Sequence, residues 1–329
     1  MKNINLAVAG VTGMVGKAFI KVLEDRGFSC SNFYAFASAR SAGKTIIFNK
    51  HEYAVEELKD DSFDRGIDIA LFSAGADVSR RFAPVAASKG CIVIDNSSAF
   101  RMDESVPLVV PEVNPEAITP GVRIIANPNC SVIPSVVALK PLHDRYGLKR
   151  VVYSTYQSVS GAGMSGYRDL EEGLKGGPPK KLPGVIAHNC LPHIDDFYDN
   201  GYTKEEIKMI NETQKIMHAP EIRITATTVR VPVFVGHCVS INAEFEIQFD
   251  MDELIGILGN APGVVLQNDH MNKIYPTPLQ AEGRDEVFVG RIRRDFSVES
   301  GVNLWVVADN VRKGAATNAV QIAEKLIGG

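Results

Sequence analysis

The sequence is short of the features that mark secreted, zinc-binding or membrane proteins. Its 329 residues include only five cysteines, and no two of them form a CxxC pair. An odd number without paired spacing argues against a disulfide framework or a zinc ribbon and favours a reducing cytoplasm. The sequence also lacks a signal-peptide core and any long apolar run, so we expect neither export nor a membrane span.

The sequence also has neither a large net charge nor low-complexity segments. The formal net charge is -4, with 45% hydrophobic and 22% charged residues, which is typical of a globular protein. Such a chain has no basic field to attract nucleic acid or acidic lipid, and we expect neither as a partner. Its length favours about two domains with a buried core.

Glycines are concentrated where the first strand-like run ends. Residues 4–9 read as a buried strand, GVTGMVG follows over residues 10–16, and a helical pattern continues to about Arg26. Glycines let the backbone approach a pyrophosphate, which binds the N–H groups at a helix start. The spacing is GxxGxxG and not GxGxxG, so a turn that only reverses the chain is the alternative. The predicted cofactor contacts here are Gly10, Thr12, Gly13, Met14, Val15 and Gly16.

Further strand patterns at 33–37, 67–72, 91–94 and 122–126 predict a parallel, doubly wound sheet. Its ligand would lie beyond the carboxyl ends of the strands. After the second strand come Ser38, Arg40 and Ser41, which could bind a 2′-phosphate, and no carboxylate. This favours NADP over NAD, with an exposed polar loop as the alternative. A second small-residue turn that could touch the cofactor comprises Ser73, Ala74 and Gly75.

Cys130 stands between a predicted turn and a predicted helix. Pro128 and Asn129 favour the turn, and residues 131–139 read as a helix whose first turn carries Pro134. Unpaired N–H groups at that helix start would stabilise a thiolate nucleophile. A buried structural cysteine is the alternative.

The rest of the chain contains longer strand-like runs and scattered polar candidates. Runs at 151–157, 225–231 and 239–247 predict a mixed sheet in a second domain, and residues 315–326 an amphipathic helix. Arg230 could hold a carboxylate and His237 could exchange the thiol proton, although a lone histidine is often structural. Glu212 and Lys215 project from one face of a predicted helix, where the alternative is a solvated ion pair. The segment HNCLPH at 188–193 matches no standard zinc spacing, so we predict no metal site.

Taken together, these segments resemble the bacterial type of aspartate-β-semialdehyde dehydrogenase over the whole chain. The resemblance is carried by GVTGMVG at 10–16, NSSAFRM at 96–102, NPNCS at 127–131, QSVSGAG at 157–163, ETQKI at 212–216 and residues 230–237.

The resemblance implies roles for individual residues. Cys130 would be the acyl-thioester nucleophile, His237 the acid and base, and Gln157 the residue that orients the substrate. The substrate and phosphate contacts would be Arg230 for the α-carboxylate, Glu212 for the ammonium group, Arg101 and Lys215 for phosphate, and Asn129. The further NADP contacts would be Ser160, Gly161, Gly163 and Asn310.

It also implies the fold and the reaction. We expect an α/β protein with a Rossmann-like NADP-binding domain, residues 1–128 with 311–329, and an α+β substrate and dimerisation domain with a mixed sheet, residues 129–310. The expected activity is the NADP- and phosphate-dependent interconversion of aspartate semialdehyde and aspartyl phosphate through a Cys130 thioester. It would serve lysine, diaminopimelate, threonine, methionine and isoleucine biosynthesis, in a cytoplasmic homodimer or homotetramer.

Three other functions are weighed against this one. N-acetyl-γ-glutamyl-phosphate reductases share the thioester chemistry, but their nucleophile motif is similar to NPGCY. This chain has Asn129 before Cys130 and Ser131 after it. Glu212 also offers a partner for an unblocked amino group. An inactive dinucleotide-binding sensor would not need Cys130 with His237, and a cysteine hydrolase would not need the glycine turn.

Overall fold

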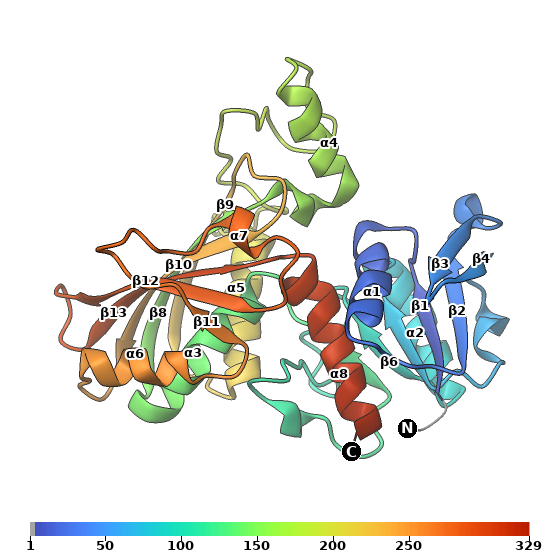
Figure 1. The fold of residues 1–329 in the computed structure, drawn as a ribbon, viewed down its shortest axis with the longest axis horizontal. Coiled ribbons are helices and arrows are strands. Elements are labelled where there is room, and N and C mark those ends of the chain that lie inside the picture. The colour runs from blue at the N-terminus through green and yellow to red at the C-terminus, as the bar shows by residue number, and fades with distance from the viewer. Residues whose placement is uncertain (1–3, 329) are drawn as a thin grey trace. The chain divides into compact units, whose positions relative to one another are not determined.

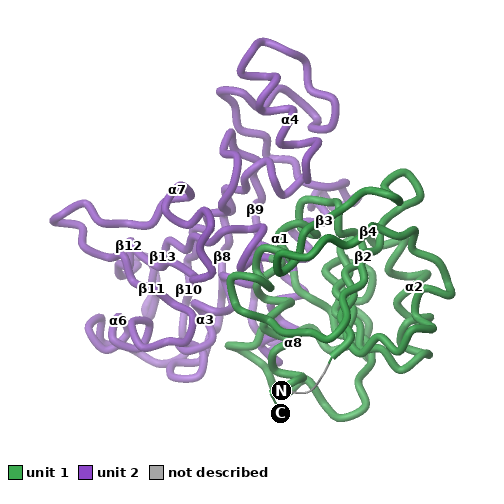
Figure 2. The backbone as a smooth tube through the Cα atoms, turned by 45° about the vertical axis from the view of Figure 1, so that its right-hand side comes forward, with its two compact units in different colours: residues 1–128, 315–329 green, residues 129–314 purple. Residues whose placement is uncertain are grey.

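The computed structural model describes residues 4–328. The chain divides into two compact units, residues 1–128 with 315–329 and residues 129–314, coloured separately in Figure 2. Figure 1 labels the elements of each unit.

The first unit is built on a seven-stranded sheet in the order β3-β4-β2-β1-β5-β6-β7. All neighbours from β4 to β7 in this order pair in parallel, as predicted. The prediction of an entirely parallel sheet is wrong at one edge, because β3 runs antiparallel to β4. Only Asn49 and Lys50 join these two strands, both with positive φ, and a two-residue turn returns the chain alongside itself. The strands are β1 (Asn5–Ala9), β2 (Asn32–Ala37), β3 (Thr45–Phe48), β4 (His51–Glu57), β5 (Ile69–Phe72), β6 (Ile92–Asp95) and β7 (Ile124–Ala126).

Helices cover both faces of this sheet, as the doubly wound class requires. In β1, Leu6 and Val8 pack in a core with α1 (Met14–Asp25) and α8 (Thr317–Gly328). The alternate residues Ala7 and Ala9 pack in another core with α2 (Ala76–Ser88). Side chains of a strand alternate between its faces, so a strand buried on both sides is apolar throughout.

The second unit contains a mixed six-stranded sheet in the order β11-β12-β13-β10-β8-β9. The predicted fold class is confirmed: β8 pairs in parallel with β9 and antiparallel with β10. Helices α3, α5 and α6 pack against strands of this sheet. The strands are β8 (Leu148–Gln157), β9 (Arg223–Arg230), β10 (His237–Phe245), β11 (Val264–Leu266), β12 (Val287–Asp295) and β13 (Gly301–Ala308), and the helices are α3 (Val132–Tyr146), α4 (Gly163–Gly173), α5 (Lys204–Met217), α6 (Met251–Gly259) and α7 (Pro278–Ala281).

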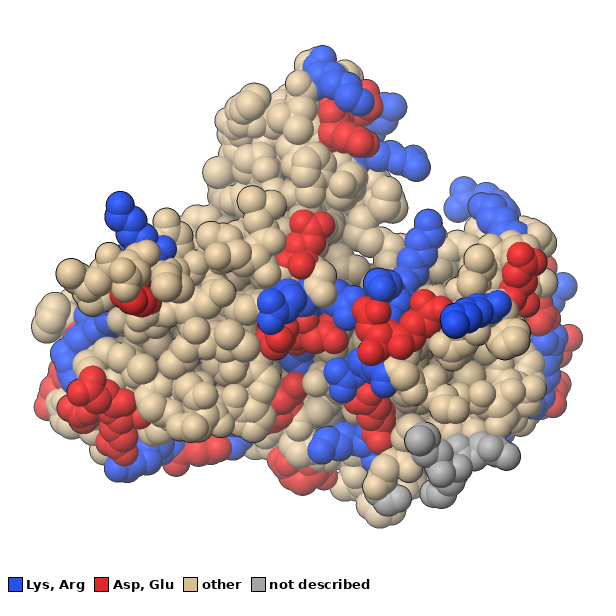
Figure 3. All heavy atoms as spheres, in the orientation of Figure 1, with Lys and Arg blue, Asp and Glu red and all other residues tan. Residues whose placement is uncertain are grey.

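Surface charges of both signs lie next to one another. Arg26 pairs with Glu324 at 2.6 Å and Arg65 with Glu56 at 2.6 Å. Acidic and basic side chains are interspersed on the face drawn in Figure 3. Within residues 4–328, no helix has the length and apolar character that crossing a membrane requires.

Candidate active site

The predicted cofactor contacts of the first unit follow three neighbouring strands, β2, β1 and β5. The loop between β1 and α1 holds Gly10 to Gly13, and Gly10 N–H donates to the carbonyl of Phe36 at the end of β2 (2.8 Å). A side chain at Gly16 would place its Cβ 2.1 Å from the carbonyl oxygen of Gly10. Only glycine therefore lets α1 start this close to the turn. The other predicted contacts of this unit stand after β2 (Ser38, Arg40, Ser41), after β5 (Ser73, Ala74, Gly75) and at the start of α1 (Met14, Val15).

The residues of this turn fit a dinucleotide. The N-cap of α1 is Gly13, which offers no side-chain hydrogen bond, and the first helical turn carries no acidic residue. Thr12 Oγ1 donates to Ser41 Oγ at 3.3 Å, which joins the loop after β2 to the glycine turn. Ser73 Oγ is buried and has no hydrogen-bond partner among the described residues. Uncapped N–H groups and an unsatisfied hydroxyl are what a phosphate group would satisfy.

In the second unit, Cys130 lies just before α3, whose N-cap is Ser131. The predicted turn and helix are both present. Asn129 accepts the N–H groups of Val132 and Ile133 at its carbonyl oxygen, each at 3.0 Å. Its side-chain Oδ1 accepts the Ser131 N–H at 2.8 Å, so Asn129 accepts from the three backbone N–H groups that follow Cys130. The nucleophile candidate is thus held in an Asx turn at a helix start.

Strand register brings four other predicted residues to one edge of the mixed sheet. Gln157 ends β8 and pairs with Arg230, which ends β9. His237 begins β10, which runs the opposite way, and pairs with Ala308 at the end of β13. Asn310 follows two residues later. The carboxyl ends of β8, β9 and β13 and the amino end of β10 therefore lie at the same end of the sheet, although these residues are far apart in the sequence.

His237 is a neutral imidazole in this setting. Burial lowers its pKa well below the ordinary range, and the positive charge of Arg230 lowers it further. The Ser158 N–H donates to Nδ1 at 3.0 Å, so the neutral ring carries its proton on Nε2. Nε2 is buried and lacks a hydrogen-bond partner among the described residues. His237 can accordingly donate from Nε2 to a ligand.

Arg230 presents a second buried donor. Its side chain is buried, and Nη1 donates to the Ser158 carbonyl at 2.7 Å, whereas Nε has no partner within the described part of the chain. Burial lowers the pKa of Arg230, and the negative charges of Glu205 and of Cys130 as thiolate act in the opposite direction. Gly161 leaves room for both groups, since its Cβ would lie 2.7 Å from Arg230 Nη1 and 3.2 Å from His237 Nε2. The cluster suits an anionic ligand.

The remaining predicted residues lie on several different elements of the two units. Glu212 on α5 is buried, and its Oε2 accepts the Asn129 N–H at 2.6 Å. Lys215 lies three residues further along α5, whereas Arg101 belongs to the first unit and donates from Nη2 to the Asn96 carbonyl at 2.9 Å. Asn310 Oδ1 accepts from Ser160 Oγ at 3.1 Å. Gly163 begins α4 with positive φ.

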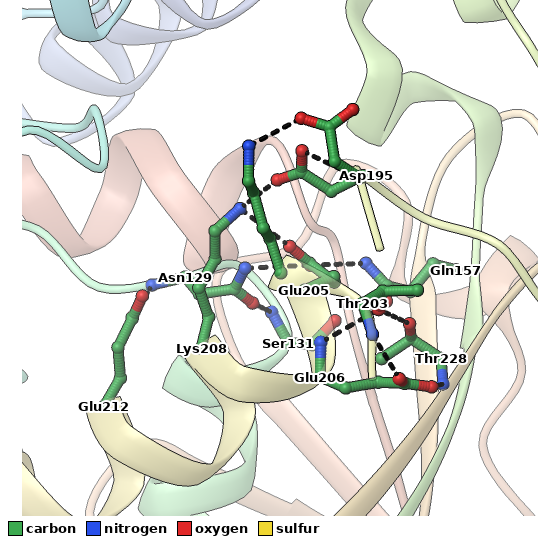
Figure 4. Close-up of polar contacts among 12 residues, drawn as sticks. Asn129, Ser131, Gln157, Asp195, Thr203, Glu205, Glu206, Lys208, Glu212 and Thr228 are labelled. Atoms are coloured by element: carbon green, nitrogen blue, oxygen red, sulfur yellow. Dashed lines mark hydrogen bonds and ion pairs between the residues drawn. The ribbon is translucent and has the colours of Figure 1, made fainter. Parts of the chain in front are cut away.

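Sequence reasoning missed two residues that the structure connects to this site. Ser158 Oγ lies 3.0 Å from His237 Nδ1 and also donates to Asn310 Oδ1 at 3.0 Å. Glu205 accepts from Asn129 Nδ2 at 2.8 Å and from Gln157 Nε2 at 3.1 Å, as Figure 4 shows. The available signal was its spacing of seven residues before Glu212, which puts both carboxylates on one helix face. Within residues 4–328, no three His, Cys, Asp or Glu side chains gather to hold a metal ion.

The matches to known proteins span nearly the entire chain. Residues 5–120 match the family model for the NAD binding domain of semialdehyde dehydrogenases, and residues 139–313 match that for their dimerisation domain. The aspartate-semialdehyde dehydrogenase of Aquifex aeolicus (strain VF5) is 54% identical, with 98% of this chain and 97% of the relative covered. That of Bacillus subtilis (strain 168) is 47% identical, with 99% and 98% covered.

Solved structures agree with these relatives. The crystal structure of aspartate semialdehyde dehydrogenase II complexed with ASA from Vibrio cholerae has a TM-score of 0.96 and 47% identity, covering 100% of this chain and 99% of that one. The aspartate semialdehyde dehydrogenase with NADP from Candida albicans has a TM-score of 0.77 and 25% identity, with 99% of each chain covered.

Proposed function

This chain belongs to the aspartate-semialdehyde dehydrogenase family, and we propose that it interconverts L-aspartate 4-semialdehyde and L-4-aspartyl phosphate with NADP and phosphate. The observation that carries the proposal is the pair of buried, unsatisfied donors, Arg230 Nε and His237 Nε2, in the unit that also holds Cys130. A carboxylate and a developing oxyanion are the ligands that such donors stabilise. We assign the reaction to lysine, diaminopimelate, threonine, methionine and isoleucine biosynthesis.

The first step is attack by Cys130. Its thiolate forms a C–S bond to the aldehyde carbon, and the carbonyl electron pair moves onto oxygen. His237 is the proposed acid and base: it donates from Nε2 to that oxygen, because Ser158 keeps the ring proton on Nε2, and it takes the proton back as the hydride leaves. When bound, the nicotinamide cofactor supplies the hydride acceptor for oxidation of this adduct, and the donor in the reverse direction. A thioester then remains on Cys130.

The second step releases the acyl group. A phosphate oxygen attacks the thioester carbon, the C–S bond breaks, and the thiolate of Cys130 leaves. We assign phosphate binding to Arg101 and Lys215, whose charges offset those of the anion. A serine ester would be a poorer acyl donor at this step, which is why the chemistry requires a thiol.

Substrate orientation falls to four side chains of the second unit. Arg230 binds the α-carboxylate through its buried guanidinium, and Glu212 faces the ammonium group. Gln157 and Asn129 fix the reacting end beside Cys130. An acidic partner for a free amino group separates this substrate from an N-acetylated one.

NADP is the proposed cofactor. Arg40, with the hydroxyls of Ser38 and Ser41, would bind the 2′-phosphate, and the relative from Candida albicans solved with NADP supports this choice. Residues 10–16 would bind the pyrophosphate of the cofactor, and residues 73–75 would contact the cofactor through their backbone. Ser160, Gly161, Gly163 and Asn310 would contact the nicotinamide end.

We also propose a homodimer, with a homotetramer as the larger alternative. Residues 139–313 match a dimerisation domain. In this unit Tyr156 is 42% exposed although it packs against Trp305, with ring centroids 5.3 Å apart. Leu279 is 85% exposed. A second copy of the chain would bury these apolar side chains.

The proposed activity is tested with purified protein and L-aspartate 4-semialdehyde. We expect NADPH formation that requires phosphate and is faster with NADP than with NAD. Cys130→Ala should lower kcat by at least about 10⁴-fold while NADP binding, followed by fluorescence, persists. Activity only with the N-acetylated glutamate semialdehyde would overturn the substrate assignment, and product release without phosphate would indicate a hydrolase.

A further inference from the structure

We infer that Asp309 is a positioning residue for the proposed reaction, because its carboxylate fixes the segment 309–314, which serves both reacting side chains of the second unit. One end of this segment lies against Cys130, and the other end forms hydrogen bonds with two neighbours of His237. Asp309 acts through this segment and not on the substrate. The inference rests on the proposed function, which gives Cys130 and His237 their roles.

The carboxylate of Asp309 accepts three backbone N–H groups from two loops. Asp309 directly follows β13 and is 3% exposed. Its Oδ1 accepts the N–H groups of Val311 at 2.8 Å and Arg312 at 3.0 Å, and its Oδ2 accepts that of Gly283 at 2.9 Å. Gly283 lies between α7 and β12. Both oxygens are therefore acceptors, and they tie the chain that leaves β13 to a second loop.

The same residue precedes a π-helical turn. The main-chain oxygen of Asp309 accepts the Gly314 N–H at 3.0 Å, five residues along the chain, which is the hydrogen bond of a π-helix. The turn comprises Arg312–Ala316. Such turns are rare and are found frequently at functional sites. Asp309 therefore determines where Gly314 lies.

Gly314 packs directly on the nucleophile. A Cβ at Gly314 would lie 3.0 Å from Cys130 Cβ and 3.0 Å from the Cys130 carbonyl oxygen, so a side chain here would require one of the two residues to move. The bare backbone of Gly314 thus supports the carbon atom that carries the thiol. Because the thiolate must reach the aldehyde carbon, a displacement of about 1 Å at this contact can slow the reaction about 100-fold.

The other end of the segment supports His237. Asn310 Oδ1 accepts the N–H of Gly236, the residue before His237, at 2.9 Å, and it also accepts from Ser158 Oγ at 3.0 Å. Ser158 Oγ lies 3.0 Å from Nδ1 of the histidine. The pairing of β10 with β13 holds His237 as well, and this pairing does not involve the carboxylate. We therefore expect the nucleophile to depend more on the carboxylate than the histidine does.

Asp169 offers a matched control in the same unit. It lies on α4, is 5% exposed, and accepts the N–H groups of Lys180, Lys181 and Leu182 at 2.9, 2.7 and 2.7 Å. Like Asp309, it is a buried carboxylate that holds three backbone N–H groups. None of these three partners is a predicted site residue, so Asp169 separates the loss of such bonds from an effect on the reaction.

Asp309→Asn should lower kcat about 10- to 100-fold. The asparagine keeps the shape of the side chain, but its NH2 group faces a backbone N–H group where a carboxylate oxygen stood, so part of the segment is released. Tm should fall by about 2–6 °C in both Asp309→Asn and Asp169→Asn. In Asp169→Asn, kcat should stay within about twofold of the unmodified protein. The dissociation constant for NADP should stay within about threefold in both variants, because the predicted cofactor contacts lie mainly in the first unit.

Gly314→Ala tests the contact with the nucleophile directly. The added methyl group should displace Cys130, and kcat should fall about 10- to 100-fold. Gly256→Ala in α6 of the same unit meets no atom within 4 Å and should keep kcat within about twofold.

The double variant Asp309→Asn/Gly314→Ala distinguishes positioning from a general loss of stability. If both substitutions act by displacing the same cysteine, their effects on kcat overlap, and the double variant should be at most about threefold slower than the slower single variant. Two independent defects would multiply instead. Asp169→Asn/Gly314→Ala is the reference, and its kcat should match that of Gly314→Ala within about twofold.

The inference is overturned if Asp309→Asn keeps kcat within about twofold, if Asp169→Asn lowers kcat as much as Asp309→Asn does, or if the losses multiply in the double variant. Should Asp309→Asn not fold, Asp309→Ser takes its place under the same criteria, because a serine hydroxyl can still accept one N–H of the segment. An unmodified protein without NADP- and phosphate-dependent turnover would instead overturn the proposed function.

Discussion

At the residue scale, the hydrogen bond from Ser158 determines the tautomer of His237. The Ser158 N–H occupies Nδ1, so the ring proton stays on Nε2, and burial with Arg230 nearby keeps the ring neutral. A neutral donor stabilises a developing oxyanion without adding a second positive charge beside Arg230. The histidine was predictable from its motif, whereas its tautomer was not, because the backbone donor is set by the pairing of β8 with β10.

The buried histidine also makes stability depend on pH. Its folded pKa lies below the unfolded value of about 6.5, so its contribution is complete above pH 6.5 and is lost as the pH falls toward the folded pKa. The loss should reach at most about 1.4 kcal/mol per pH unit. His237→Gln should flatten this slope between pH 6.5 and 5 in urea unfolding. Exposed His51→Gln serves as the control, and an equal slope in His237→Gln would contradict the assignment.

At the element scale, the close approach of α1 to the glycine turn limits substitution. Gly16→Ala would put a Cβ 2.1 Å from the Gly10 carbonyl, so α1 must shift. We expect the free energy of unfolding to fall by about 1–3 kcal/mol and the dissociation constant for NADP to rise about tenfold. Gly256→Ala in α6 meets no atom within 4 Å and should leave NADP binding unchanged. Unaltered NADP affinity in Gly16→Ala would show that the turn does not set the cofactor site.

Elements with strong apolar patterns were predictable, and weakly patterned ones were not. The core strands β1, β5 and β6 read directly from the sequence because they are buried on both faces. β3 was missed because it is a short strand at a sheet edge, where Thr45 and Ile47 are exposed and only Phe48 is fully buried. The last helix was predicted from residue 315, but residues 312–316 form a π-helical turn before α8 begins at Thr317. Glu205 was not singled out from the sequence, because only the tertiary fold buries it.

At the scale of the whole molecule, the proposed chemistry is divided between two units. The glycine turn and Arg101 belong to the first, and Cys130, Gln157, Arg230 and His237 to the second. The position of each of these residues in the sequence was enough to assign it to a unit, and the family resemblance supplied the role of each residue. What local patterns could not supply was the meeting of β8, β9, β10 and β13 at one sheet edge, because strand register depends on pairing between distant segments.

The central claim is that Cys130 carries an acyl group between hydride transfer and phosphate attack. The most direct test mixes the protein with L-aspartate 4-semialdehyde and NADP without phosphate, and follows NADPH absorbance and intact protein mass. We expect a burst of no more than one NADPH per chain, an acyl adduct on the peptide containing Cys130, and renewed turnover when phosphate is added. Steady NADPH formation without phosphate, or a burst without an adduct on Cys130, would contradict the account.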